Sequence, residues 1–179
     1  MSSAAALSLA NARLGSAGDL GAWLEAEGAL EPEERAGVAL RLAEFVTLRA
    51  SIRELLDASI GGGPFPAGAL ERVNEASARV PRALRLAPDG AADTPVSAGA
   101  TPLLLARIAW SAIELLGDPD RSRPRRCGAC GSYFEATRSD RVWCSNACGN
   151  RTRVARHHAR ATGARVTSRR DHVSGPRRA

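Results

Sequence analysis

The chain has 179 residues, a mass of 18.8 kDa and 44% hydrophobic residues, which suits one ordinary domain with a small appendage. Aromatic residues make up only 4%, so the core must consist mainly of Leu, Val, Ile and Ala. We find no run of about 18 apolar residues and no basic, apolar leader. These features exclude a membrane protein, a secreted disulfide miniprotein and a wholly disordered chain, and we expect a cytoplasmic location.

The first hundred-odd residues predict a helical domain, which we bound at 1–120. Apolar residues at helical spacing predict a first helix over 4–14. Asp19 is expected to cap a short second helix that ends near Gly28, because aspartate caps helix starts and glycine commonly follows helix ends.

Four further elements follow in this part of the chain. They are a helix over 31–58 stopped by the glycines at 61–63, a helix over 67–79 with Leu70, Val73 and Ala76–Ser77 inward, a short β-hairpin over 80–96 and a helix over 101–116. The first of these helices begins at Glu31-Pro32, where proline suits the first turn and the acidic residues face the positive end of the helix dipole. Pro88-Asp89-Gly90 predicts the hairpin turn.

Four polar or aromatic residues of the helical domain have two possible roles. Trp23 and Trp110 are expected to pack in the core, and stacking on a ligand is the alternative. Asn11 and Asn74 lie at helix positions that could face inward, where a buried amide needs partners. They are expected to be structural, and lining a small-molecule pocket is the alternative.

The charge is divided unevenly along the chain. Residues 1–120 carry 10 Arg and 16 acidic residues, a net charge of −6, whereas residues 121–179 carry 15 Arg and 3 acidic residues, a net charge of +12. An acidic body joined to a basic C-terminal third predicts two modules, and the basic one would attract a polyanion. We interpret residues 121–126 as a short basic linker.

All four cysteines lie in the basic third, and they are Cys127, Cys130, Cys144 and Cys148. Zinc prefers four soft ligands in a tetrahedron, and a Cys-x2-Cys turn supplies two of them. The spacing therefore predicts one structural zinc ion, with an iron–sulfur cluster or redox-active thiols as alternatives. Gly128 and Gly131 would let the backbone turn its N–H groups toward sulfur.

Between the cysteine pairs, residues 133–134 and 142–143 are apolar or aromatic and flank a turn-like segment at 137–140. This pattern predicts a minimal β-hairpin. Ser145 or Asn146 would then cap a helix that has Cys148 in its first turn.

The predicted fold class is mainly α with a small β-hairpin. A helical N-terminal domain at 1–120 precedes a treble-clef-like four-cysteine zinc finger at 121–163, and a disordered basic tail at 164–179 ends the chain.

Four basic side chains of the last helix share one face by helical spacing. They are Arg153, Arg156, His157 and Arg160. Ala147 and Val154 lie on the other side, where we expect them to pack against the hairpin. Arginine contacts phosphates or reads guanine edges, so the basic face predicts a DNA-binding surface, with a solvated face as the alternative. Four cysteines already satisfy zinc, so the histidines are not expected to be ligands.

The segment WCSNACGNR, which ends at Arg151, resembles the signature of the CGNR zinc-finger family, and the following TRVARHHAR resembles that family's basic helix. Upstream, ALSLANARL, DLGAWLEAEG, LRASIRELLDA and LLLARIAWSAIELL are similar to the ABATE domain that usually precedes this finger. The resemblance implies a stress-linked bacterial transcription regulator whose helical domain senses a signal or dimerises. It also implies that the four cysteines bind zinc.

The resemblance further implies that Gly149, Asn150 and Arg151 carry the motif after the cysteines. Gly149 would let the helix backbone approach its neighbour closely. Asn150 would bond backbone groups of the knuckle, or contact a base or phosphate. Arg151 would contact a phosphate or donate to the finger.

We therefore expect a nucleoid-associated regulator that binds duplex DNA and holds one zinc ion. A homodimer and a small-molecule ligand of the helical domain are further expected partners, and a membrane is not. Two alternatives stay open: an RNA-binding or ribosome-associated protein, and an interaction adaptor with a purely structural zinc. No nucleophile–base pair, open metal site or phosphate loop indicates an enzyme.

Overall fold

The computed structural model describes residues 4–28, 30–81, 85–93, 98–117, 123–138 and 140–168. Six helices precede the cysteine-rich part: α1 (Ala4–Asn11), α2 (Ala17–Glu27), α3 (Pro32–Ala39), α4 (Leu42–Gly61), α5 (Ala67–Ala78) and α6 (Ala100–Gly117). The strands β1 (Arg85–Leu86) and β2 (Ala92–Asp93) form one antiparallel hairpin, and β3 (Arg123–Arg126) and β4 (Tyr133–Ala136) form another. The last helix is α7 (Asn146–Ser168). The predicted class, mainly α with a small hairpin, is confirmed.

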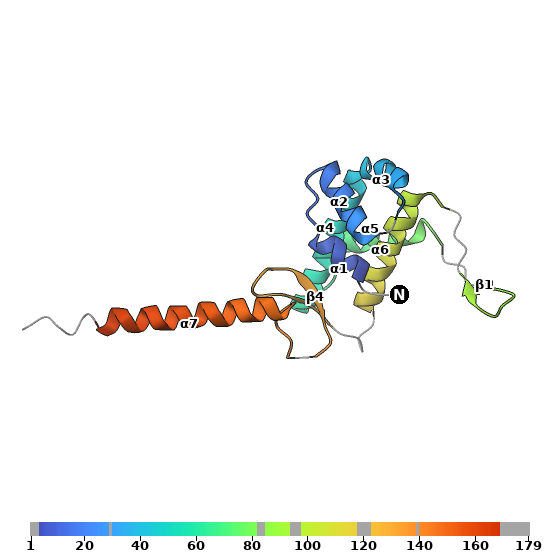
Figure 1. Ribbon diagram of the computed structural model, residues 1–179. Helices are drawn as coiled ribbons and strands as arrows, with labels where there is room; N and C mark the ends of the chain where they lie inside the picture. Colours follow the sequence, from blue (N-terminus) through green and yellow to red (C-terminus); the bar gives the residue numbers. More distant parts are fainter. Residues whose placement is uncertain are drawn as a thin grey trace, which may run out of the picture.

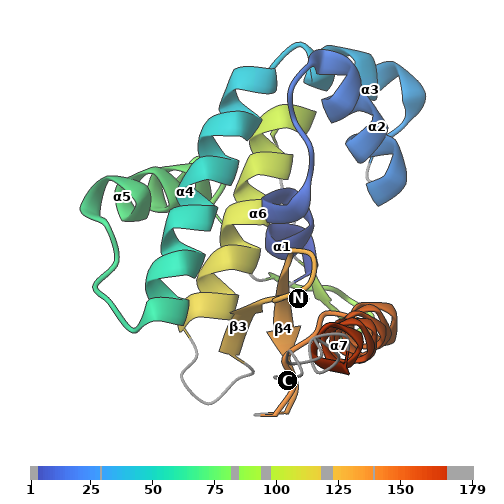
Figure 2. The same ribbon diagram turned by 90° about the vertical axis from the view of Figure 1, so that its left-hand side faces the viewer.

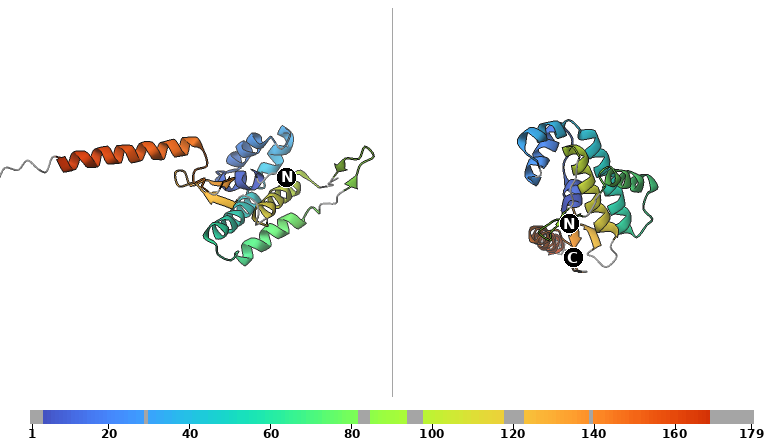
Figure 3. Two further views of the ribbon diagram at one scale, coloured as in Figure 1. Left: turned by 90° about the horizontal axis from the view of Figure 1, so that it is seen from below. Right: turned by 90° about the vertical axis from the view of Figure 1, so that its right-hand side faces the viewer.

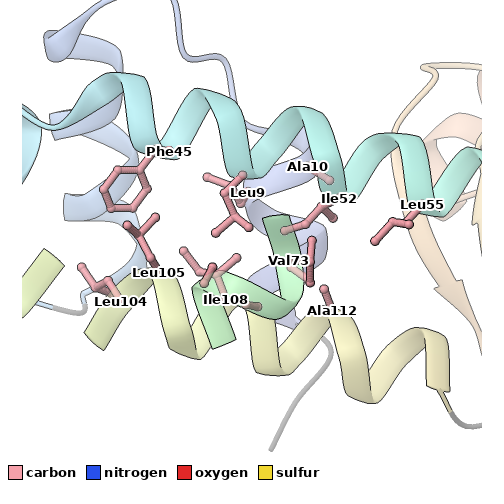
Figure 4. Packing of buried hydrophobic residues seen from close by; sticks show 14 of the residues in the cluster. Leu9, Ala10, Phe45, Ile52, Leu55, Val73, Leu104, Leu105, Ile108 and Ala112 are labelled. Carbon is pink, nitrogen blue, oxygen red and sulfur yellow. The ribbon is translucent and has the colours of Figure 1, made fainter. Parts of the chain in front are cut away.

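The core of the helical domain lies between α4 and α6, which run side by side with α5 and α1 packed against them (Figure 2). Apolar side chains from all four helices meet there, among them Phe45 and Ile52 of α4 and Ile108 of α6 (Figure 4). Trp110 is also buried, as predicted, and its indole N–H donates to the carbonyl of Ser77 at 3.2 Å. The helices therefore share one apolar core.

Among the described residues, α6 is the one helix that is long and apolar enough to cross a membrane. The sequence shows no uninterrupted apolar run here, because Arg107 and Glu114 lie within the helix. Half of the window is buried inside the domain, and the helix packs against α1, α4 and α5. The central helix of a bundle passes the same test of length and composition.

Two helix starts depend on serine hydroxyls. The backbone N–H of Ala6 in α1 donates to Ser111 Oγ of α6 at 3.0 Å, and Ser111 is buried. The N-cap of α2 is Ser16, whose Oγ accepts from the Asp19 N–H at 3.1 Å. The expectation that Asp19 is the cap is therefore wrong. Its carboxylate instead accepts from the Gly15 N–H at 2.8 Å, which lowers the pKa of Asp19.

The single helix expected over 31–58 is two helices, α3 and α4. Arg41 between them has a non-helical conformation, with φ −95° and ψ 26°, and Leu40 beside it is exposed. The break allows α3 to pack against α2. The predicted end of α4 is confirmed, because Gly62 takes the left-handed conformation, with φ 69°, in which glycine has no steric penalty.

Some inward-facing positions of the N-terminal domain differ from expectation. Leu70 of α5 is 41% exposed, because the buried stripe of this helix consists of Ala69, Val73 and Ala76. The β1–β2 hairpin agrees with the predicted turn, and its Leu86 is exposed. Residues 82–84 and 94–97 of the predicted hairpin lie outside the described residues.

Candidate metal centre and basic helix

The first cysteine pair lies in the turn of the β3–β4 hairpin. The Cys127 N–H donates to the carbonyl of Ser132 at 2.9 Å, and the Gly131 N–H donates to the carbonyl of Cys127 at 2.8 Å. Gly131 has a φ of 76°, a left-handed conformation that favours glycine, in agreement with the predicted turn. The hairpin and the metal knuckle are therefore one unit.

Two expectations about this region are wrong. Residues 123–126 form β3 and are not a linker; residues 121–122 lie outside the described part of the chain. The partner of β4 is β3, whereas residues 142–143 form no strand. The side chain of Arg141 stabilises this segment instead, because it donates to the carbonyls of Trp143 at 3.1 Å and Cys144 at 2.6 Å.

The second cysteine pair is positioned by the start of α7. Cys144 lies just before the helix and Cys148 in its first turn, where the Cys148 N–H donates to Ser145 Oγ at 3.3 Å. The predicted cap by Ser145 or Asn146 is thus made by Ser145.

The four sulfur atoms form a compact cluster. All lie within 4.8 Å of one another, and Sγ of Cys144 is 3.5 Å from that of Cys130 and 3.6 Å from that of Cys148. A tetrahedral zinc site with Zn–S bonds of about 2.3 Å places its sulfurs about 3.8 Å apart. The donor set and the size of the cluster therefore fit one zinc ion. Within the described ranges, this group of metal-binding side chains contains no histidine.

The thiols of the cluster differ in acidity. Burial opposes ionisation of Cys127, but backbone N–H groups of Cys144, Ala129 and Cys130 donate toward its sulfur and lower its pKa to about 6. Hydrogen bonds from Ser132 lower the pKa of Cys130. Burial and the neighbouring thiols raise the pKa of Cys144 to about 12. Loading with zinc must therefore displace a proton from Cys144.

The ring of Trp143 is wedged beside the cluster between two glycines. A Cβ at Gly128 would lie 3.2 Å from Cζ3 of this ring, and one at Gly149 would lie 3.1 Å from Cδ1. Both distances are tighter than an ordinary contact between carbons. Gly149 was expected to allow a close approach of the helix to its neighbour, and that neighbour is Trp143. Gly128 was expected to allow a backbone turn, but its role is to leave room for the same ring.

The orientation of α7 differs from expectation. Cys148 and Gly149 are buried, whereas Ala147 and Val154 are exposed and do not pack on the hairpin. The side of α7 that bears Arg153 and Arg156 borders a groove whose other wall consists of residues 137–138 and 140–143. The basic face and the packed face are therefore adjacent sides of one helix.

The remaining motif residues are exposed. Asn150 accepts a hydrogen bond from the guanidinium of Arg153 and does not bond the knuckle backbone. Arg151 projects from α7 at about 140–160° from Arg153 and Arg156, given 3.6 residues per turn. Hence it does not share their face. The helix continues to Ser168, so residues 164–168 are not a disordered tail, and the rest of the predicted tail lies outside the described residues.

A sequence model of a family described as "putative stress-induced transcription regulator", ABATE, matches residues 3–119. The chain belongs to the ABATE family. A model of the CGNR zinc finger matches residues 123–161. The ABATE domain and the CGNR finger thus occur in the expected order, and the four-cysteine cluster is the metal site of the finger. The search of curated proteins found no match.

The CGNR finger is docked on the ABATE domain through β4. Asn11 at the end of α1 pairs with the backbone of Tyr133: its Nδ2 donates to the carbonyl and its Oδ1 accepts from the N–H, both at 2.8 Å. The amide side chain therefore acts as a short stretch of neighbouring strand. The structural role expected for Asn11 is therefore confirmed. Asn74, in contrast, is exposed and lines a surface pocket.

The side chain of Tyr133 completes this joint. It is only 3% exposed, and its hydroxyl donates to Asp57 Oδ1 at 2.9 Å. The guanidinium groups of Arg53 and Arg126 each lie 5.4 Å from the centroid of its ring. Tyr133 thus belongs to the core of the ABATE domain, while the next residue, Phe134, belongs to the core of the finger.

Sequence reasoning missed this joint. Asn11 was recognised as a candidate inward-facing amide, but nothing local connects it with a strand 122 residues later. One signal was available. Neighbouring strand residues face opposite sides, so two successive aromatic residues, Tyr133 and Phe134, indicate that both sides of β4 are buried.

Proposed function

We propose that this protein is a non-enzymatic, cytoplasmic transcription regulator that binds duplex DNA through α7 and the CGNR finger. The observation that carries the proposal is the form of α7. This helix leaves the zinc centre and extends away from the body (Figures 1 and 3), and it contains no acidic residue. Residues 153–161 are all exposed. An exposed basic helix that is anchored at one end is suited to bind a groove of duplex DNA and its phosphates.

The arginines of α7 that we assign to DNA are Arg153, Arg156 and Arg160, with His157 beside them. Their side chains project from one side of the helix, so they can meet one groove of a duplex together. Because its first turn carries Cys148, the metal centre fixes the position and direction of the helix. A single finger covers little DNA, so specific recognition requires a second copy of the chain or the basic residues beyond α7.

We further propose that the ABATE domain pairs with a second copy or receives a signal. Support comes from an apolar patch beside α5 and α6, which consists of Phe65, Leu70 and Ile113, each 39–41% exposed. These three side chains line one cavity of about 150 Å³. Exposed apolar residues that gather in this way are typical of interaction sites.

The DNA part of the proposal is tested by selection from a random duplex library, with the zinc-loaded chain at near-physiological salt. We expect an enriched motif, and a palindromic one if the chain pairs. Replacement of Arg153, Arg156 and Arg160 by alanine should abolish binding. Retained binding by that variant, or a preference for structured RNA at equal salt, would contradict the proposal.

The pairing part is tested by sedimentation equilibrium. Leu70→Glu should shift the chain toward the monomer, because it places a charge in the apolar patch. Leu86→Glu is the matched control, since Leu86 is 80% exposed on the β1–β2 hairpin away from that patch. A wild-type monomer at all concentrations would leave signal reception as the role of the domain.

A further inference from the structure

The groove beside the zinc centre has walls from two parts of the finger. One wall consists of residues 137–138 and 140–143, and the other is the side of α7 that carries Gly149, Thr152 and Arg156. The groove has a volume of about 580 Å³. Ser145 and Asn146 line it where the helix begins, and Trp143 lines it beside the metal cluster. It is therefore a built feature of the finger and not a property of α7 alone.

Positive charge dominates this groove. Its lining includes four arginines, which are Arg138, Arg141, Arg153 and Arg156, and one acidic residue, Asp140. Two of the arginines are held in place, because Arg141 donates to two backbone carbonyls and lies 5.3 Å from the centroid of Phe134, and Arg153 donates to Asn150. Among the described residues, the guanidinium groups of Arg138 and Arg156 make no hydrogen bond or ion pair.

We propose that this groove is a cleft for the phosphodiester backbone of a nucleic acid, so that residues 137–138 and 140–143 bind the same strand as α7. The inference rests on the proposed function and deepens it by naming a second contact element. Arginine suits phosphate because its planar group can donate two parallel hydrogen bonds.

A long anion fits this surface better than a small one. The arginine row leaves the groove along α7 and continues at Arg160. At a rise of 1.5 Å per residue, Arg153 and Arg160 are about 10 Å apart along the axis. One phosphate cannot span that distance, whereas successive phosphates of one strand can.

The test compares two charge-matched variants of the full, zinc-loaded chain. Arg138→Ala removes a groove arginine that is not on α7, and Arg151→Ala removes an exposed arginine from the opposite side of α7. Binding to a short fluorescent duplex is measured by anisotropy over a series of salt concentrations. Zinc content and thermal unfolding verify that both variants are folded.

We expect Arg138→Ala to weaken binding about tenfold and to reduce the slope of log K against log salt by about 0.9, because one phosphate contact is lost. Arg151→Ala should change affinity less than about twofold. Equal losses would mean diffuse attraction only and would overturn the groove, while leaving DNA binding intact. An unchanged Arg138→Ala variant would likewise overturn it.

Failure of the proposed function gives a different result. If the wild-type chain binds no duplex and no RNA, both the regulator and the nucleic-acid cleft are wrong. Inorganic polyphosphate, titrated against the tryptophan fluorescence to which Trp143 in the groove contributes, then tells whether the groove binds any anion. Quenching in the wild type that is lost in Arg138→Ala would identify a cleft for another polyanion.

Discussion

The ABATE domain and the CGNR finger are in contact, but each is stabilised by different interactions. The ABATE domain buries a continuous apolar cluster drawn from several helices. The buried residues of the finger's own cluster are Cys127, Phe134, Ala136 and Cys148, two of them metal ligands. Beyond its first turns, α7 lies in the open (Figure 1). The finger therefore depends on its metal and on its docking partner, whereas the ABATE domain depends mainly on its own helices and takes one core side chain, Tyr133, from the finger.

The largest expected effect follows from removing the metal. Cys144→Ser should abolish zinc binding and unfold residues 123–168, because a structural zinc ion contributes about 10–16 kcal/mol of apparent binding free energy that a small finger cannot replace. The ABATE helices should stay folded. Hydrogen exchange followed by mass spectrometry resolves the two regions.

Wild-type chain treated with a strong chelator is the control for this variant, and it should give the same exchange pattern. Protection that survives in α7 after chelation would show that the helix is stable without its anchor. Loss of protection in α4 and α6 as well would mean that the two regions unfold as one unit.

The next largest effect is expected at the contact between the two domains, where Asn11 binds the backbone of Tyr133. Asn11→Ala leaves the N–H and carbonyl of Tyr133 without their partner, so the free energy of unfolding should fall by about 1–3 kcal/mol. The finger should then unfold at a lower denaturant concentration than the ABATE domain. Asn74→Ala, the same change at an exposed site, should leave both transitions in place.

Coincident unfolding of the two regions in Asn11→Ala would contradict this role of the amide. Tyr133→Phe provides a second check, since it removes only the hydroxyl that donates to Asp57 and keeps the ring between two arginines. It should be milder than Asn11→Ala.

Zinc affinity should depend on pH, in contrast to the stability of the apolar ABATE core. Cys144, with a pKa of about 12, is protonated at neutral pH without metal and must lose its proton to bind zinc. Apparent affinity should therefore rise at least about tenfold for each pH unit around pH 7–8. Below about pH 6 the dependence should steepen, because Cys127 with its pKa of about 6 is also protonated there. Competition with a chromophoric chelator, corrected for the chelator's own protonation, measures this; a flat profile would contradict it.

The smallest effect is expected inside the ABATE domain. Ser111→Ala leaves the Ala6 N–H at the start of α1 without its buried acceptor, and should lower the free energy of unfolding by about 1 kcal/mol. Ser59→Ala, at a partly buried position of α4, is the control. Urea unfolding measures the stability of the two variants. Equal stabilities would mean that water or another group accepts the hydrogen bond of the Ala6 N–H in Ser111→Ala.

Local chemistry made much of the finger predictable. The cysteine spacing determines which residues can converge on one metal ion, and Gly131 and Ser145 are required by turn and cap geometry within a few residues. The same holds for Gly62 after α4. Each of these features depends on near neighbours in the chain, so the sequence displays it directly.

The helix pattern was less reliable where packing competed with it. The break at Leu40 and Arg41 has no proline or glycine, and only the packing of α3 against α2 explains it. The hairpin was assigned to the wrong strand because residues 123–126 are basic and contain proline, which hides a strand whose partner is β4.

By itself, the sequence determined the class of fold, the metal ligands and the location of the positive charge, because periodicity, ligand spacing and net charge are properties of short segments. Only the tertiary structure decided which side of α7 packs, where the groove opens and how the finger docks. The docking depends on a contact across more than a hundred residues, Asn11 with Tyr133, whereas the packed side of α7 and the groove depend on how the ring of Trp143 lies against Gly128 and Gly149. No local pattern specifies such pairs, because either partner could have satisfied its hydrogen bonds with water.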